Sequence, residues 1–344
     1  MLDEGPFLPQ NAVKARLADA LLYEDQVFDE VKKLTRAKSI KKLKPEDYNR
    51  ISPASLGLEG GSRIALVYAV GGIYRGEDDI DPLGGDQSIG ADTLTRALEE
   101  VAAADDIKGV ILRIDSPGGD AFASDQIWRH MHLLRAKKPI VISMSDEAAS
   151  GGYYIAMSGD PIVAYPGTFT GSIGLVAGKF NLRGLYDKIG VKKEILSRGK
   201  HAEIDTDYRG FTPSERQKLL EEMNTFYRSF VDKVAAARKR SFEEIDALAQ
   251  GRVWLGSQAK QNGLVDELGG FDRAIALLKQ RANLKPEDKV TLVPYPAPKN
   301  VLDLLMSQLD GLAGEDPVLR RLRRWRARLD GRMLKISPYR VDIK

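Results

Sequence analysis

Two short segments constrain the fold of this chain most, because each joins a hydrophobic run to a glycine pair. Residues 114–119 read Ile-Asp-Ser-Pro-Gly-Gly, and residues 148–154 read Ala-Ala-Ser-Gly-Gly-Tyr-Tyr. Where a strand passes into a helix, the first backbone N–H groups have no intrahelical acceptor and stay open to an anion. Ser150 beside Gly151 is therefore a candidate nucleophile for acyl transfer, and the turn at Gly119 can supply the other wall of an oxyanion site.

The alternative role of Ser150 is that of a helix N-cap, which is common for serine and contributes only about 1 kcal/mol. The small residues on both sides favour a nucleophile, because they let backbone approach closely and leave the hydroxyl uncovered. A Pro-Gly-Gly turn alone is a weak signal, since such turns also simply reverse a chain. The two segments together, at this spacing, indicate a site.

Alternating strands and helices from Arg63 onward predict an α/β fold of repeated βαβ units with a mainly parallel sheet. Capping boxes at Thr212 and Ser241 begin two further helices, the first of which extends to about Arg240. The expected strands are Ile64–Val70, Val110–Ile114, Ile140–Ser143, Ile162–Ala164, Ile173–Val176 and Lys193–Leu196, and the expected helices between them are Ile89–Ala103, Ser124–Arg135 and Ser150–Met157.

The composition is that of a globular protein without cysteine chemistry. Among the 344 residues 43% are hydrophobic, and the absence of cysteine excludes disulfides, cysteine-based zinc sites and cysteine nucleophiles. The net charge of +3 is too small to indicate a nucleic-acid partner. No run approaches the roughly 20 apolar residues of a membrane span, and the acidic start, Met-Leu-Asp-Glu-Gly-Pro, does not predict a signal peptide.

Four segments are expected along the chain. Residues 1–34 form short helices, residues 35–60 a basic and glycine-containing linker or arm, residues 61–285 the main domain, and residues 286–344 an extension with a basic helix. The first segment repeats the end of the main domain at an offset of 247 positions. We interpret it as the tail of a preceding copy of the domain, although chance similarity of two amphipathic helices remains the alternative. The paired residues are Phe7, Ala12, Leu17, Asp19 and Asp25 with Trp254, Ala259, Leu264, Asp266 and Asp272.

A serine nucleophile needs a base, and histidine is scarce in this chain. His130 and His132 fall on the helix after the first glycine turn, where surface or packing roles are expected, and no histidine lies between Ser150 and His201. Lysine can serve instead when burial lowers its pKa toward neutrality. Such a lysine needs a hydroxyl neighbour, and Ser172 in a Thr-Gly-Ser-Ile-Gly segment offers one.

Taken together, these motifs resemble the signal peptide peptidase A family, also called protease IV. The resemblance covers roughly residues 61–285 and includes Gly-Arg-Val-Trp at 251–254 and Gly-Leu-Val-Asp-Glu at 263–267. It implies a Ser/Lys-dyad protease of ClpP/crotonase-like fold that needs no cofactor and degrades hydrophobic peptides such as cleaved signal peptides. The implied roles are nucleophile for Ser150, a hydrogen bond to the lysine for Ser172, and the oxyanion hole for the amides of Gly119 and Gly151.

This chain differs from the single-domain form of the family at the position of the catalytic lysine. That form carries its lysine in a segment resembling residues 199–204, at the place where this chain has Ala202. Lys200 lies two residues earlier and would face the same way on an extended strand, so it is a fallback base. The long form of the family is a tandem duplication with the lysine in its first copy, which implies that this chain is the serine-bearing half.

The resemblance also implies homo-oligomers at the extracytoplasmic face of the bacterial inner membrane, with the membrane reached through an N-terminal region outside this chain. An acyl-CoA-binding crotonase relative and a non-catalytic assembly module are the alternative functions. Two further segments are weaker functional signals, because each also has an ordinary structural explanation. The arginine-rich stretch Leu319–Leu329 with Trp325 can face lipid or solvent. The acidic loop of Asp78, Asp79 and Asp81 is by default a polar loop, and we expect no metal site.

Overall fold

The computed structural model describes residues 8–40, 60–78 and 88–296. The chain divides into two compact units, Met1–Glu59 and Gly60–Lys344. Phe7, Asp79, Asp81 and the basic stretch at 319–329 lie outside the described residues, as does most of the expected linker. Within the described part, no helix combines the length and apolar character that crossing a membrane requires.

The first unit contains two helices that bury nothing. They are α1 (Pro9–Lys14) and α2 (Glu24–Thr35), and neither has a buried residue. The apolar spacing predicts that the first helix runs from Asn11 to Leu22, but α1 ends at Lys14, because Arg16 adopts a left-handed backbone with φ of 58°. The expected inward face of the second helix is not buried in this unit, since Val27 is 43% exposed.

The second unit is built on an eight-stranded sheet with the order β10-β1-β4-β5-β6-β9, to which β7 and β8 attach through β5. Every pairing is parallel except that of β7 with β8, and a small parallel sheet pairs β2 (Gly72–Tyr74) with β3 (Ser88–Gly90). The strands of the large sheet are β1 Ser62–Val70, β4 Ile107–Ser116, β5 Ile140–Ala149, β6 Ile162–Ala164, β7 Phe169–Gly171, β8 Val253–Leu255, β9 Glu267–Leu268 and β10 Val290–Tyr295.

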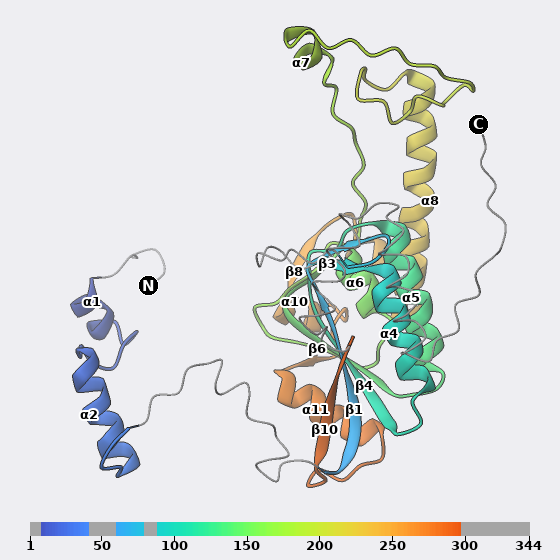
Figure 1. Ribbon diagram of the computed structural model, residues 1–344. Coiled ribbons are helices and arrows are strands. Elements are labelled where there is room, and N and C mark those ends of the chain that lie inside the picture. Colours follow the sequence, from blue (N-terminus) through green and yellow to red (C-terminus); the bar gives the residue numbers. More distant parts are fainter. Residues whose placement is uncertain (1–7, 41–59, 79–87, 297–344) are drawn as a thin grey trace, which may run out of the picture. The chain divides into compact units, whose positions relative to one another are not determined.

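Helices cover both faces of this sheet, because its strands alternate apolar residues between the two faces. Ala65 and Val67 of β1 join the core under α4 and α5, whereas Ile64 and Leu66 join the core under α11. Figure 1 shows α4 and α5 side by side along the sheet. The helices of this unit are α4 Ala91–Ala103, α5 Ala121–Arg135, α6 Gly151–Ala156, α7 Arg183–Lys188, α8 Pro213–Arg238, α9 Phe242–Asp246, α10 Gly256–Gln261 and α11 Phe271–Arg281.

The α/β prediction with a mainly parallel sheet is confirmed, but two expected strands are wrong. Residues 173–176 and 193–196 are irregular; Ile173 is fully buried, but Val176 is 97% exposed and residues 193–196 are all exposed. Their apolar runs therefore do not mark buried strands. In addition, β10 lies beyond the expected domain boundary at 285 and pairs with β1, so the sheet extends into the segment predicted as an extension.

The long helix α8 carries an irregular arm away from the sheet (Figure 1). Its 26 residues span roughly 39 Å, and it begins with the predicted capping box between Thr212 and Glu215. Arg209 of the arm donates to both carboxylate oxygens of Glu215, at 2.7 and 2.8 Å. The arm of residues 176–211, which contains α7, is thereby held at the beginning of α8.

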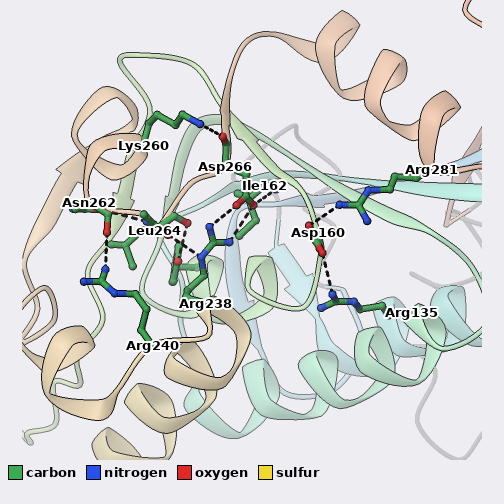
Figure 2. A network of polar contacts seen from close by, with 12 residues as sticks. Arg135, Asp160, Ile162, Arg238, Arg240, Lys260, Asn262, Leu264, Asp266 and Arg281 are labelled. Carbon is green, nitrogen blue, oxygen red and sulfur yellow. Dashed lines mark hydrogen bonds and ion pairs between the residues drawn. The ribbon is translucent and has the colours of Figure 1, made fainter.

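The other end of α8 is anchored at Asp266 (Figure 2). The Asp266 carboxylate accepts two hydrogen bonds from Arg238, at 2.5 and 3.0 Å, and one from the amide of Ile162 at 2.8 Å. Arg238 also donates to the carbonyl of Gly263 at 2.8 Å. Burial raises the pKa of Asp266, but the hydrogen bonds from Arg238 and Ile162 outweigh burial and hold the pKa below 3.8. This network joins α8, β6 and the turn before β9.

We predict that Asp266→Ala lowers the free energy of unfolding by about 3 kcal/mol, because it leaves Arg238, only 12% exposed, without its anion. Urea unfolding measures the loss, with Asp187→Ala as control, since the 3.9 Å pair of Asp187 with Arg183 is exposed. The carboxylate's contribution is present above its ordinary pKa of 3.8 and is lost as pH falls through the lower folded value. The difference in the free energy of unfolding between wild type and Asp266→Ala should therefore become smaller below about pH 4. A difference that becomes larger there would contradict this account.

Candidate active site

Ser150 sits in a strained turn between β5 and α6. Its φ of 51° and ψ of −116° are unfavourable for a residue with a Cβ, at a cost of about 1–3 kcal/mol. Its side chain makes no capping hydrogen bond, while its amide donates to the carbonyl of Gly171 at 2.9 Å. The hydroxyl is therefore not used as an N-cap, and the partly exposed side chain is free for other chemistry.

The first glycine turn packs directly on this junction, with no side chain between the two backbones. Gly118 has φ of +99°, and a Cβ there would lie 2.5 Å from the amide nitrogen of Gly151. Gly119 has φ of +155°, and a Cβ there would lie 2.1 Å from the carbonyl oxygen of Ile73 in β2. Only glycine fits at these two positions, so the close approach is built into the sequence.

The amides of Gly119 and Gly151 lie side by side at this contact. A Cβ built on Gly151 would be 3.1 Å from the amide nitrogen of Gly119. Neither amide finds an acceptor among the described residues. Two neighbouring N–H groups beside Ser150 can stabilise a negatively charged oxygen that develops on a bound carbonyl.

Ser150 and both glycines line one cavity that is open to solvent. Aromatic side chains of α8 and α6 form much of the remaining wall, so the cavity is largely apolar. The sequence did not identify these aromatics as site residues, although the spacing of Phe226, Tyr227 and Phe230 on one helix face was a usable signal. The other lining residues are Ala121, Ser124, Tyr154, Gly174 and Leu175.

Ser172 lies next to Ser150 in the sheet. It directly follows β7, whose Gly171 is in register with Ala149 of β5. Like Ser150 it has a left-handed backbone, with φ of 47°, and its amide donates to the carbonyl of Arg252 at 2.7 Å. The structure thus places the two predicted serines at neighbouring strand ends, as the Ser/Lys hypothesis requires.

Lys200 is not brought to Ser150. It is exposed in the arm, where the neighbouring His201 side chain contacts the hydroxyl of Ser214 at 3.0 Å. Ser214 is at the beginning of α8, roughly 18 Å along the helix from Phe226, which lines the cavity. Figure 1 shows the arm at the end of α8 remote from α6. Of the described residues, those lining the cavity include no lysine and no histidine.

One lysine does approach a residue of the cavity wall. Lys233 of α8 donates to the Tyr154 hydroxyl at 2.7 Å and to the Asp125 carboxylate, and its ammonium lies 4.5 Å from the ring centroid of Trp128. Tyr154 donates to Asp125 at 2.6 Å. Burial raises the pKa of Asp125, but the hydrogen bonds from Lys233 and Tyr154 outweigh it and lower the pKa overall. The cluster fixes the ring of Tyr154 between α5, α6 and α8.

The two histidines of α5 have the structural roles expected for them. His130 contacts the carbonyl of Gln126 at 2.9 Å and Glu99 at 3.2 Å, and His132 stacks on Trp128. Asp78 accepts the amide of Gly90 at 2.7 Å, which is a loop contact. No group of three or more potential metal-ligating side chains occurs in the described ranges.

Comparison with known proteins places this site in a family context. The model of peptidase family S49 matches residues 132–285, and that of Clp protease matches residues 86–168, which confirms the expected ClpP/crotonase-like fold. The chain is 40% identical over 327 residues to "Serine protease SPPA, chloroplastic" of Arabidopsis thaliana, covering 93% of this chain and 48% of the relative. It is 37% identical over 266 residues to "Protease 4" of Salmonella typhi, covering 77% of this chain and 41% of the relative.

A shorter relative is covered more completely. A putative protease of Methanocaldococcus jannaschii is 33% identical over 234 residues, which are 68% of this chain and 75% of the relative. The chain spans about half the length, or less, of the two longer relatives. The matched regions include the Ser150 junction and the turn that holds Ser172.

We predict that Ser150→Gly raises the free energy of unfolding by about 1 kcal/mol, because glycine adopts positive φ without strain. Ser62→Gly is the matched control, since Ser62 lies in the extended strand β1, where glycine costs about 0.5–1 kcal/mol. Urea unfolding compares the two variants. A Ser150→Gly protein that is less stable than wild type would show that the junction is not strained.

Proposed function

Because the chain belongs to peptidase family S49, together with the SppA and protease 4 proteins, we propose that it hydrolyses peptide bonds with Ser150 as nucleophile. The observation that carries this proposal is the meeting of Ser150, Gly119 and Gly151 at one cavity. A strained, uncapped serine hydroxyl beside two open amides is suited to acyl transfer.

The reaction would proceed in two steps. The Ser150 Oγ attacks the carbonyl carbon while its proton passes to the base, and the amides of Gly119 and Gly151 hold the oxyanion of the tetrahedral intermediate. The C–N bond then breaks, and the leaving amine takes the proton from the base. Water, deprotonated by the same base, hydrolyses the acyl-enzyme and restores the hydroxyl.

The base would be a lysine from a second copy of the domain, oriented by the hydroxyl of Ser172. Two observations support this assignment. The lining of the cavity holds neither lysine nor histidine in the described part of the chain, and Lys200 is held with the arm at the beginning of α8. Burial of the incoming lysine against the aromatic wall would lower its pKa, as a lysine base requires.

The substrates would be hydrophobic peptides, such as cleaved signal peptides at the bacterial inner membrane. The apolar wall formed by Tyr154, Phe226 and Phe230 supports this class, because it can accommodate an apolar side chain next to the scissile bond. The arm supports a homo-oligomer, since it exposes large apolar residues that water solvates poorly. Among them, Phe180 is 83% and Ile189 61% exposed.

We predict that, in assays that include a lysine-bearing copy of the domain to supply the base, Ser150→Ala abolishes both peptide hydrolysis and labelling by a fluorophosphonate probe, because the attacking oxygen is lost. Ser145→Ala, a change at a serine within β5, is the control and should label as wild type does. Labelling is measured by in-gel fluorescence. Undiminished labelling of Ser150→Ala would remove Ser150 from the site and leave the acyl-CoA-binding alternative, which a thermal-shift titration with coenzyme A would then examine.

We predict that Lys200→Ala keeps the labelling rate within about twofold of wild type, because Lys200 lies on the arm and not at the cavity. With the lysine-bearing copy of the domain present, Ser172→Ala should lower the rate by about 10²-fold, as expected for a group that orients a general base. A Lys200→Ala protein that no longer labels, and that recovers labelling when mixed with Ser150→Ala protein, would instead make Lys200 the base across an oligomer contact.

We predict that Phe226→Asp lowers kcat/KM for peptides with leucine before the scissile bond at least tenfold more than for those with alanine. A charge in the apolar wall penalises burial of the larger side chain. Leu220→Asp is the control, because Leu220 is 49% exposed on the same helix. Equal losses for the two peptides would show that the cavity does not receive this side chain.

A further inference from the structure

The two helices of the first unit repeat an element of the second unit at a constant offset. Pro9 and Gly256, which begin α1 and α10, are 247 positions apart, and both helices are six residues long. Glu24 and Phe271, which begin α2 and α11, are separated by the same interval. The helix bounds therefore reproduce the repeat that the sequence indicated.

The turn between the helices is also reproduced. Arg16 has φ of 58°, and its counterpart Gly263 has φ of 81°. One residue later, the amide of Leu17 donates to the carbonyl of Ala12 at 2.8 Å, as the amide of Leu264 does to that of Ala259. A left-handed residue in the same place is costly for arginine, so this match is not a general property of two amphipathic helices.

The end of the second helix repeats as well. Arg36 and its counterpart Asn283 have φ of 54° and 56°. The next amide, of Ala37, donates to the carbonyl of Lys32 at 3.2 Å, and the amide of Leu284 donates to that of Lys279 at 2.8 Å. Residues 8–37 and 255–284 thus agree in where both helices begin and in the turn that follows each helix.

In the second unit this element packs into the core, at a position that we call its seat. Ala259, Leu264 and Leu278 are fully buried, β9 pairs with β6, and the Asp266 carboxylate binds Arg238 and the amide of Ile162. In the first unit the same positions are unburied. Leu17, the counterpart of Leu264, is 55% exposed, and Asp19, the counterpart of Asp266, is exposed.

We propose that residues 8–37 are a docking element for a second domain of this fold, which provides the edge strand and the arginine that β6 and Arg238 provide here. Leu17 would enter the core of that domain, and Asp19 would accept the arginine and one strand amide. This docking does not involve Ser150 and is independent of the proposed peptidase activity.

The occupant would be a related domain and not another copy of this chain. In this chain the seat is already occupied by residues 255–284. The seat also has no room for a proline at the position of Pro9. A Cβ at Gly256, the counterpart of Pro9, would lie 2.0 Å from the backbone oxygen of Tyr165. The partner domain must therefore differ from this one beside the first helix.

The test transplants residues 10–21 of the chain in place of residues 257–268, so that Pro9 is left out. The transplant keeps Ala259, Leu264, Asp266 and Leu268 unchanged in identity. We expect it to unfold in one cooperative thermal transition. Changing the transplanted aspartate (Asp19→Ala) should then lower its midpoint by roughly 6–12 °C, as Asp266→Ala does in the unaltered chain.

The matched control exchanges the two key residues of the transplant, Leu17→Asp with Asp19→Leu, which keeps composition and length. The proposal fails if this control is as stable as the transplant. If the transplant itself does not fold, a smaller variant tests the proposal instead. It carries residues 15–19 in place of residues 262–266, through the changes Asn262→Ala, Gly263→Arg and Val265→Ala. The proposal is overturned if that variant is also unfolded, or if Asp266→Ala costs it nothing.

In the unaltered chain, Leu17→Asp and Asp19→Ala are expected to leave the thermal midpoint and the native mass unchanged, because the element has no seat there. Size-exclusion chromatography with light scattering measures the mass. A lower mass for either variant would mean that the element docks on a second copy of this chain, which would overturn the proposed occupant.

Discussion

The candidate site depends on backbone packed against backbone at the carboxyl ends of parallel strands. A Cβ on Gly152 would lie 2.5 Å from the carbonyl oxygen of Ser116, and one on Gly151 would lie 2.6 Å from the hydroxyl of Ser124. With Gly118 and Gly119 on the opposite side, four glycines bring the end of β4 against the start of α6. Because no side chain intervenes, the amides of Gly119 and Gly151 are held in place by the sheet itself, and their positions require no loop to order when a substrate binds.

The strain at the two serines is supported by the same sheet. β7 pairs with β5 at Gly171 and Ala149, and it also pairs antiparallel with β8. The amides of Ser150 and Ser172 are both used in hydrogen bonds to neighbouring backbone, so neither residue can relax its positive φ without breaking one. A strained residue that its surroundings hold in place is typical of functional sites. Here two such residues, Ser150 and Ser172, follow adjacent strand ends.

Local chemistry was predictable from the sequence, whereas the placement of distant segments was not. The positions of Gly119, Ser150 and Ser172 at strand ends were predictable, because glycine and serine at such junctions are recognisable within a few residues; their roles in catalysis stay predictions. Phe226 and Phe230 were missed because a helix pattern does not say which face meets the site, and the packing of α8 includes contacts between distant residues, such as that of Arg238 with Asp266. Apolar runs at 173–176 and 193–196 predicted strands, but Leu196 and its neighbours remain exposed in the arm, where hydrophobicity does not report burial.

The repeated helix pair separates what local sequence decides from what packing decides. The turn at Arg16 has the backbone of the turn at Gly263 although nothing is buried against α1 or α2. The conformation is therefore encoded within the element, while burial of its apolar face requires a seat. An element that holds its shape before docking loses less conformational entropy when it docks. This smaller entropy loss favours the docked state of such a segment over the exposed state, provided that a domain presents the matching strand and arginine.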